Sequence, residues 1–113
     1  MTITVFLSKA LLCVASQCFP ALVGDATPVG TFKVTRADTD LPGYGGDVLM
    51  FSENAKTILA IHRVWLLKPS EKRLERLFSD DPEQRRHVTN GCINIDPDLY
   101  DSLSDSDELD IIP

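Results

Sequence analysis

Short apolar and β-branched runs, separated by glycine, proline and small polar residues, recur along most of this chain. Runs of this length and composition are typical of β-strands in half-buried sheets. Only two stretches are expected to be helical. The pattern therefore predicts a mainly β fold, a small β-sandwich or open barrel with one or two short helices. The expected strands cover residues 3–7, two arms around Ala15–Ser16, 32–35, 47–51, 57–64, 93–95 and 109–112.

Both expected helices carry signals for where they begin. Residues 69–79 have apolar side chains at helical spacing and a suitable N-cap in Ser70, which predicts an amphipathic helix of about two turns. The second helix is expected over residues 97–103, with Asp96 as its cap and Pro97 in its first position. Between the two, residues 80–86 are interpreted as a polar connection.

A tight turn at Ala15–Ser16 would place Cys13 opposite Cys18 in a hairpin. Directly opposed residues lie roughly 4.5–5.5 Å apart at Cβ, a spacing that suits a disulfide. The alternative is two small buried side chains, since free cysteines usually behave as small hydrophobes. The chain has no CxxC pair and no second ligand cluster, so no metal or other cofactor is expected.

The composition narrows the class of protein. A chain of 113 residues with 43% hydrophobic residues is expected to form one domain, 1–113. The net charge of −6 excludes a general nucleic-acid binder, and no run reaches the ~20 apolar residues that a membrane span needs. Seven of the eleven basic residues lie between Arg63 and Arg86, which indicates a local cationic pocket.

The stretch HVTNGCIN, residues 87–94, has the form of a nucleophile turn leading into a strand. Cys92 follows a glycine, and glycine lets a bound carbonyl approach the backbone N–H groups. A thiol nucleophile needs a base, and the chain offers only His62 and His87. His62 lies in a predicted strand that is expected to pair beside the strand after Cys92. His87, on the connecting segment, is expected at the rim.

Three pieces taken in order, TPVGTF, IHRV and TNGCIN, resemble the catalytic domain of the L,D-transpeptidase (YkuD-type) family. The resemblance extends over nearly the whole chain. The family pattern has a histidine, a variable stretch, Ser or Thr, usually His, then Gly, Cys, an apolar residue and Asn or Arg. The matching positions here are His62, Thr89, Asn90, Gly91, Cys92, Ile93 and Asn94.

The resemblance implies a mechanism that agrees with the chemistry of these residues. Cys92 would attack the carbonyl of an L,D-peptide bond in a peptidoglycan stem tetrapeptide, and His62 would take the thiol proton. The backbone carbonyl of Arg63 would orient the second ring nitrogen of the histidine. Backbone N–H groups of Asn90, Gly91 and Cys92 would stabilise the oxyanion. An amine acceptor would then give transpeptidation or exchange, and water would give L,D-carboxypeptidase activity.

The chain departs from the family pattern at three places. Asn90 replaces the usual histidine, Arg63 replaces a commoner small residue, and the interval between His62 and Cys92 is longer than usual. We interpret the excess, residues 66–86, as a helical insertion or flap over the site. Its basic side chains could attract stem carboxylates or could serve only as solvated charges; they are Lys68, Lys72, Arg73, Arg76, Arg85 and Arg86.

Further side chains are candidates for substrate binding. Tyr44 lies in a glycine-rich loop, residues 38–46, of the kind found at site rims. Trp65 begins the insertion and could pack its helix onto the sheet. Core or rim packing is the alternative for both. Asn94 either holds the turn or contacts substrate. The complete set of substrate-binding candidates is Thr89, Asn94, Tyr44, Arg86, Arg73 and His87.

The expected function is thus a bacterial cell-wall acyltransferase without a cofactor. The alternatives are an L,D-carboxypeptidase that recycles tetrapeptides or acts as a secreted antibacterial effector, a non-catalytic murein-binding domain, and a redox or metal protein. The N-terminal stretch only loosely resembles a secretory signal. The expected location is the periplasm or cell envelope if a leader was trimmed, and otherwise the cytoplasm or a dedicated secretion route. The sequence does not specify a secretion or immunity partner.

Overall fold

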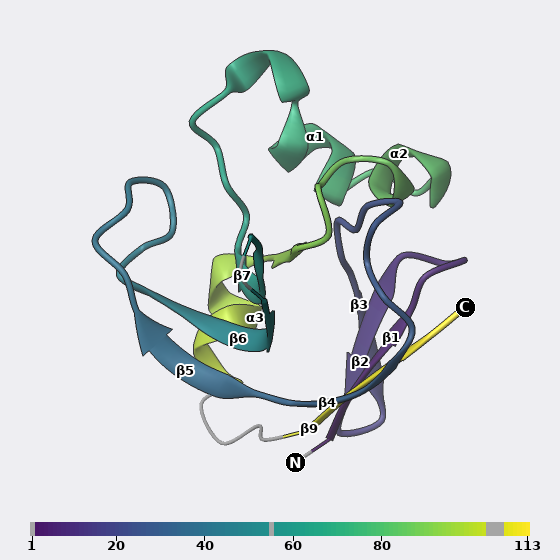
Figure 1. The fold of residues 1–113 in the computed structure, drawn as a ribbon. Helices are drawn as coiled ribbons and strands as arrows, with labels where there is room; N and C mark the ends of the chain where they lie inside the picture. The colour runs from purple at the N-terminus through teal and green to yellow at the C-terminus, as the bar shows by residue number, and fades with distance from the viewer. Residues whose placement is uncertain (1, 55, 104–107) are drawn as a thin grey trace.

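The computed structural model describes residues 2–54, 56–103 and 108–113 and contains two mixed β-sheets (Figure 1). The mainly β prediction is confirmed. One sheet has the order β3-β2-β1-β9-β4, and the other has the order β5-β6-β7-β8. The first sheet comprises β1 (Thr2–Phe6), β2 (Leu11–Val14), β3 (Gln17–Pro20), β4 (Gly30–Lys33) and β9 (Glu108–Ile112). The second comprises β5 (Thr35–Asp38), β6 (Asp47–Glu53), β7 (Ile58–Arg63) and β8 (Ile93–Ile95).

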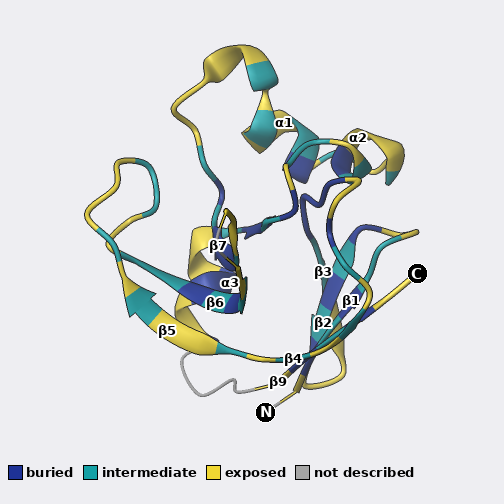
Figure 2. Ribbon diagram, viewed as in Figure 1, coloured by how far each residue is buried: buried dark blue, intermediate teal, exposed yellow. Residues whose placement is uncertain are grey.

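The core consists mainly of buried side chains that alternate with more exposed ones along these strands. The buried positions are dark blue in Figure 2. In β1, Ile3 and Val5 are buried while their neighbours are more exposed, as expected for a strand with one face covered. Strands of both sheets contribute to this one cluster, and Tyr100 joins it from the helix after β8. The strands of the two sheets are therefore held by a shared core, and the chain crosses between the sheets at Val34.

The β2–β3 hairpin has the predicted register. Ala15 and Ser16 have φ of 51° and 66°, the positive values that a two-residue turn of the primed type requires. Cys13 pairs with Cys18 across the hairpin, and the two form a disulfide. The alternative of two free buried thiols is therefore wrong.

The insertion does not contain the predicted two-turn helix. Residues 69–79 are split into a 3₁₀ turn (Pro69–Glu71) and α1 (Arg73–Leu77), with Lys72 between them in the left-handed conformation at φ 52°. Ser70 lies inside the 3₁₀ turn and is not the N-cap, and neither N-cap residue makes a side-chain cap hydrogen bond. Only Leu77 is buried in α1, so tertiary packing stabilises one turn and no more.

The predicted polar connection at residues 80–86 contains a further short helix, α2 (Glu83–Arg86). Its Arg85 is 4% exposed, and Nη2 and Nε donate to the carbonyl oxygens of Lys9 and Ala10 at 2.9 and 3.2 Å. Neither alternative for Arg85, attraction of stem carboxylates or a solvated charge, is correct, because its buried guanidinium donates to buried carbonyls. Arg85 instead ties the insertion to the β1–β2 turn.

The last helix, α3 (Pro97–Asp101), forms as expected. The Asp96 side chain accepts from the backbone N–H groups of Asp98 and Leu99 at 3.0 and 3.4 Å, and Pro97 stands at the start. The described residues thus hold three short α-helices, one more than the upper number expected. None of them has the length and apolar character of a helix that crosses a membrane.

Candidate active site

A pocket of about 280 Å³ lies where the insertion, the glycine-rich loop and the Cys92 turn meet. Cys92 and His62 both line it, so the structure brings the two residues into one pocket. Thr89 and Asn90 from the turn, Tyr44 from the loop and Arg73 from the insertion also reach this pocket. Its full lining is Tyr44, His62, Trp65, Lys68, Glu71, Arg73, Thr89, Asn90 and Cys92.

The parallel pairing of β7 with β8 explains why residues so far apart in sequence meet. Ile61 pairs with Ile93 and His62 pairs with Asn94, so the two strands lie side by side as predicted. Ile61 and Ile93 point into the core, both with 0% exposure. Because side chains alternate between faces of a strand, His62 and Asn94 project to the opposite face, and Cys92 precedes Asn94 by two positions.

The turn that carries Cys92 is fixed by hydroxyl groups. Gly91 has φ of +129°, a conformation that L side chains rarely adopt. Its N–H donates to Oγ1 of Thr89 at 3.1 Å, and the Thr89 hydroxyl donates to the carbonyl of Cys92 at 2.6 Å. Thr27 Oγ1 donates to the Gly91 carbonyl at 3.0 Å from the other side. Sequence reasoning missed Thr27 in this role, although it stands in the TPVGTF piece.

These contacts change the expected roles of Thr89 and Gly91. The Thr89 hydroxyl, predicted to bind substrate, is engaged in holding the turn. The Gly91 N–H, predicted to face the oxyanion, points to Thr89 and can serve an oxyanion only after that hydrogen bond breaks. An oxyanion hole in this geometry would therefore depend on the N–H groups of Asn90 and Cys92.

His62 is 2% exposed and is held on both sides. Its Nδ1 lies 2.7 Å from the backbone carbonyl oxygen of Arg63, the contact that the resemblance implied. The Tyr44 ring packs edge-on against the imidazole with centroids 4.7 Å apart. Burial, aided by the positive charge of Arg73 and opposed by the hydrogen bond to the Arg63 carbonyl, lowers the pKa of His62 to about 4. His62 is therefore neutral at pH 7, with Nε2 available as a base.

Cys92 is half-buried, and its thiol donates to the carbonyl oxygen of Ile58 at 3.8 Å. Burial raises the pKa of the thiol, although the Ala60 N–H and the charge of Arg73 favour the thiolate. Within the described part of the chain no hydrogen bond joins Cys92 to His62. A neutral thiol and a neutral imidazole suit general-base catalysis, in which the proton leaves as the sulfur attacks.

Asn94 is completely buried, which corrects the expectation that it binds substrate. Its Oδ1 accepts from the Trp65 N–H and from Nη1 of Arg73, both at 3.0 Å. Its Nδ2 lies 3.5 Å from Nε2 of His62. Asn94 thus contacts protein groups on every polar atom of its side chain and connects the insertion to the histidine.

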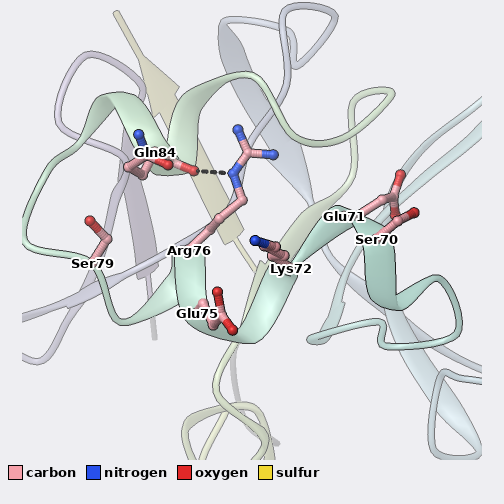
Figure 3. Close-up of a pocket in the computed structure, with 7 residues that line it drawn as sticks. All are labelled: Ser70, Glu71, Lys72, Glu75, Arg76, Ser79 and Gln84. Atoms are coloured by element: carbon pink, nitrogen blue, oxygen red, sulfur yellow. Dashed lines mark hydrogen bonds between the residues drawn. The ribbon is translucent and has the colours of Figure 1, made fainter.

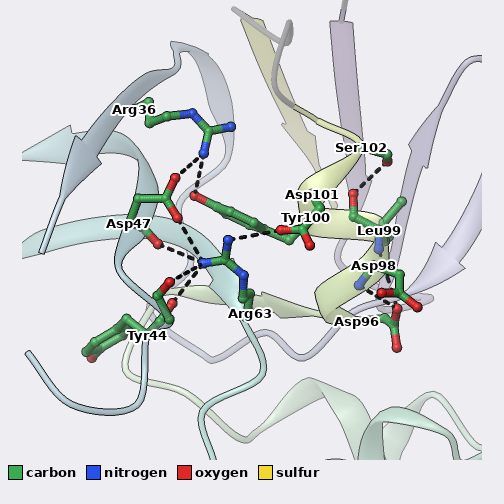
Figure 4. Close-up of polar contacts among 11 residues, drawn as sticks. Arg36, Tyr44, Asp47, Arg63, Asp96, Asp98, Leu99, Tyr100, Asp101 and Ser102 are labelled. Carbon is green, nitrogen blue, oxygen red and sulfur yellow. Dashed lines mark hydrogen bonds and ion pairs between the residues drawn. The ribbon is translucent and has the colours of Figure 1, made fainter.

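Arg63, the residue that departs from the family pattern, organises the loop in front of His62 (Figure 4). Its guanidinium donates to the Tyr44 carbonyl at 3.0 Å and to carboxylates of Asp47 and Asp101, both at 2.9 Å, and lies 4.2 Å from the centre of the Tyr100 ring. Arg63 therefore holds the loop so that Tyr44 contacts His62. No pattern in the sequence pointed to these partners beyond the adjacency of Arg63 to the histidine.

The ion pairs of Arg63 also set the charge of Asp47. Desolvation raises the pKa of this carboxyl group, but hydrogen bonds and charges from Arg63 and Arg36 outweigh that effect. The pKa is therefore below its ordinary value. Asp47 remains an anion that fixes both guanidinium groups.

The two remaining substrate-binding candidates lie outside the pocket lining. Arg86 pairs with Glu83, Nη1 to Oε1 at 2.6 Å. His87 places Nδ1 at 2.5 Å from Asp25 and Nε2 at 3.5 Å from Glu83. The prediction that Arg86 and His87 bind substrate in this pocket is therefore corrected, because they form an exposed set of ion pairs beside α2.

A larger pocket of about 500 Å³ lies over α1 (Figure 3). Charged side chains line it, and Arg76 closes one side by donating from Nε to the Gln84 carbonyl at 2.9 Å. Its two serine hydroxyls, Ser70 and Ser79, have no histidine beside them in the lining. In the described residues no group of three histidine, cysteine or acidic side chains is arranged to hold a metal ion. Of these two pockets, the one lined by Cys92 combines a nucleophile with a histidine base, so it is the candidate active site.

Comparison with known proteins finds no family model, curated protein sequence or solved structure that matches this chain.

Proposed function

We propose that this protein is a cysteine acyltransferase of the L,D-transpeptidase type that acts on peptidoglycan stem tetrapeptides. The observation that carries the proposal is the shared pocket of Cys92 and His62, which reach it from the β7–β8 parallel pair. The Nδ1 contact of His62 with the Arg63 carbonyl adds support, because it leaves Nε2 as the basic nitrogen.

The reaction proceeds through a thioester. Cys92 Sγ bonds to the stem carbonyl carbon as its proton passes to His62 Nε2, and the oxyanion is stabilised by backbone N–H groups of the turn. The C–N bond to the terminal D-amino acid then breaks, and its nitrogen takes the proton from His62. An acceptor amine attacks the thioester, loses a proton to His62 and releases Cys92 as a thiol.

The lining of the pocket suits such a substrate. Lys68 and Arg73 outweigh Glu71 in the lining, and this positive charge in a chain whose net charge is −6 favours a peptide that carries carboxylates. Tyr44 and Trp65 supply ring surface for its aliphatic parts. The Cys13–Cys18 disulfide favours an oxidising compartment, and hence the cell envelope, over the cytoplasm.

Water could replace the amine, giving L,D-carboxypeptidase activity, and the openness of the pocket to solvent favours neither acceptor. A non-catalytic murein-binding domain is the alternative of another class. Its support is the thiol of Cys92, which donates to the Ile58 carbonyl and has a raised pKa. Retention of a nucleophile and an oriented base in one pocket favours the enzyme.

Mass analysis of products separates these functions. The protein is incubated with disaccharide-tetrapeptide, with and without an added D-amino acid. Loss of the terminal residue identifies carboxypeptidase activity, its replacement identifies exchange, and dimers identify cross-linking. Cys92→Ser and His62→Ala are expected to abolish every product, while His87→Ala, the matched histidine control, retains activity. Absence of product, together with absence of a Cys92 adduct from a carbapenem, would reject the enzyme.

A further inference from the structure

The side-chain amide of Asn94 has only one chemically consistent orientation. Two N–H donors, from the Trp65 backbone and from Nη1 of Arg73, lie 3.0 Å from the same amide atom. That atom must be the oxygen, because an NH₂ group cannot accept from them. The NH₂ group therefore faces Nε2 of His62 at 3.5 Å.

This orientation agrees with the tautomer of His62 that the Arg63 carbonyl sets. Facing an N–H donor, Nε2 must present its lone pair, so the ring proton resides on Nδ1 and is donated to the Arg63 carbonyl at 2.7 Å. A doubly protonated ring would set an N–H of His62 against an N–H of Asn94. The buried amide therefore favours the neutral ring. The Asn94 residue is 0% exposed, so surrounding atoms pack against its side chain on all sides.

Arg73 holds the amide in this orientation and is itself held. Its Nε donates to Oε1 of Glu71 at 3.0 Å, and its guanidinium lies 5.1 Å from the centre of the Trp65 ring. Only 13% of its side chain is exposed. Lys72, in the left-handed conformation immediately before it, ends the 3₁₀ turn so that α1 begins with Arg73. The break that the sequence did not predict is thus what delivers this side chain to the pocket.

We propose that Arg73 is a positioning residue that locks the Asn94 amide against Nε2 of His62 and thereby keeps the imidazole neutral, with its proton on Nδ1. The segment 66–86 then positions the base through Arg73 and does more than cover the site. This deepens the proposed function, because His62 is the base of that reaction and its Nε2 must exchange the 3.5 Å contact with Asn94 for the thiol proton. It also replaces the expected contact of Arg73 with substrate by a contact with Asn94.

The other charged and titratable groups around His62 do not substitute for Arg73. Lys68 and Glu71 line the same pocket from the insertion, Tyr44 packs on the ring from the loop, and Cys92 lines the pocket from the turn. The guanidinium of Arg63 is directed to Asp47 and Asp101. Among these groups, only Arg73 contacts the amide that faces Nε2.

The test is ¹⁵N NMR of histidine-labelled protein, which reads the tautomer and the titration of each ring directly. The chain has only two histidines, so exposed His87 serves as an internal reference. In the unaltered protein, His62 is expected to show the Nδ1–H tautomer and to remain neutral down to about pH 5. Arg73→Met removes both the hydrogen bond and the charge, and should raise the titration midpoint of His62 by about 1 pH unit.

Two further variants make the result decisive. Arg76→Met removes the same charge from the same helix, but Arg76 bonds to the Gln84 carbonyl (Figure 3), so His62 should be unchanged. Arg73→Gln keeps an N–H donor without the charge, and is expected to keep the tautomer while raising the midpoint less than Arg73→Met. It also gives a readable sample if Arg73→Met does not fold.

The proposal is overturned if the Arg73 variants leave the midpoint of His62 unchanged, or if Arg76→Met shifts the midpoint equally. Neither measurement depends on turnover. A protein without product in the tetrapeptide assay but with the expected Arg73 effect would refute the proposed function and leave the positioning role intact. Normal products with an unchanged His62 in the Arg73 variants would refute the positioning role alone.

Discussion

Gly91 offers a sharp test of how the Cys92 turn is built. Its φ of +129° is costly for alanine, and a Cβ there would lie 2.8 Å from Cδ2 of Leu59. Backbone strain of this kind costs about 1–3 kcal/mol. The contact adds about 1 kcal/mol, because the Leu59 methyl group is a side-chain end that can move only partly within the packing around it. Gly91→Ala should therefore destabilise the protein by about 3 kcal/mol.

Gly46 is the matched control, with φ of +105° and open space around an added Cβ. Gly46→Ala should lose stability only through backbone strain, so the loss for Gly91→Ala should be larger by about 1 kcal/mol. Adding Leu59→Ala to Gly91→Ala should remove the part of this loss that comes from the contact with Leu59. Urea denaturation monitored by circular dichroism measures each free energy of unfolding. Equal losses for the two glycine variants, or a loss below about 0.5 kcal/mol for Gly91→Ala, would refute this account of the turn.

Three other predictions concern the supports of the site. Folding lowers the pKa of His62 to about 4, so the stability that its neutral ring provides is fully present above about pH 6.5. This stability should decline by up to about 3 kcal/mol as the pH falls toward 4. In urea titrations, His62→Gln should lose this pH dependence. Arg85→Met leaves buried carbonyls unpaired and should cost about 2–4 kcal/mol by the same method. Reduction of Cys13–Cys18 should cost about 2 kcal/mol and lower the melting temperature, whereas Cys92→Ser should make no such difference.

Local pairing rules were sufficient for the parts of the fold in which neighbours in sequence are neighbours in space. The Ala15–Ser16 turn fixed the register of its hairpin, and with it the contact between Cys13 and Cys18. Asp96 capped α3 for the same reason. The approach of His62 and Cys92 was also predictable, because a strand that leaves and returns through a long crossover can pair in parallel with its successor.

The sequence could not reveal side chains whose role depends on distant partners. Arg85 looked like one more surface cation, yet it is buried because carbonyls of Lys9 and Ala10 receive its N–H groups. Likewise, the left-handed conformation of Lys72 is not a property of lysine, and it divides a segment whose apolar spacing favoured a continuous helix. The contact of Asn94 with Arg73 required that division.

The parallel pairing of β1 with β9 has a consequence for the order of folding. Thr2 pairs with Glu108, so this contact closes a loop that contains almost all of the described chain. The entropy of such a closure is about 4 kcal/mol and must be overcome before the contact gives any stability. β9 also lies between β1 and β4, so this sheet is complete only after β9 has paired with both β1 and β4. Until then β1 presents an unpaired edge, and the interval before closure is when intermolecular strand pairing competes with folding.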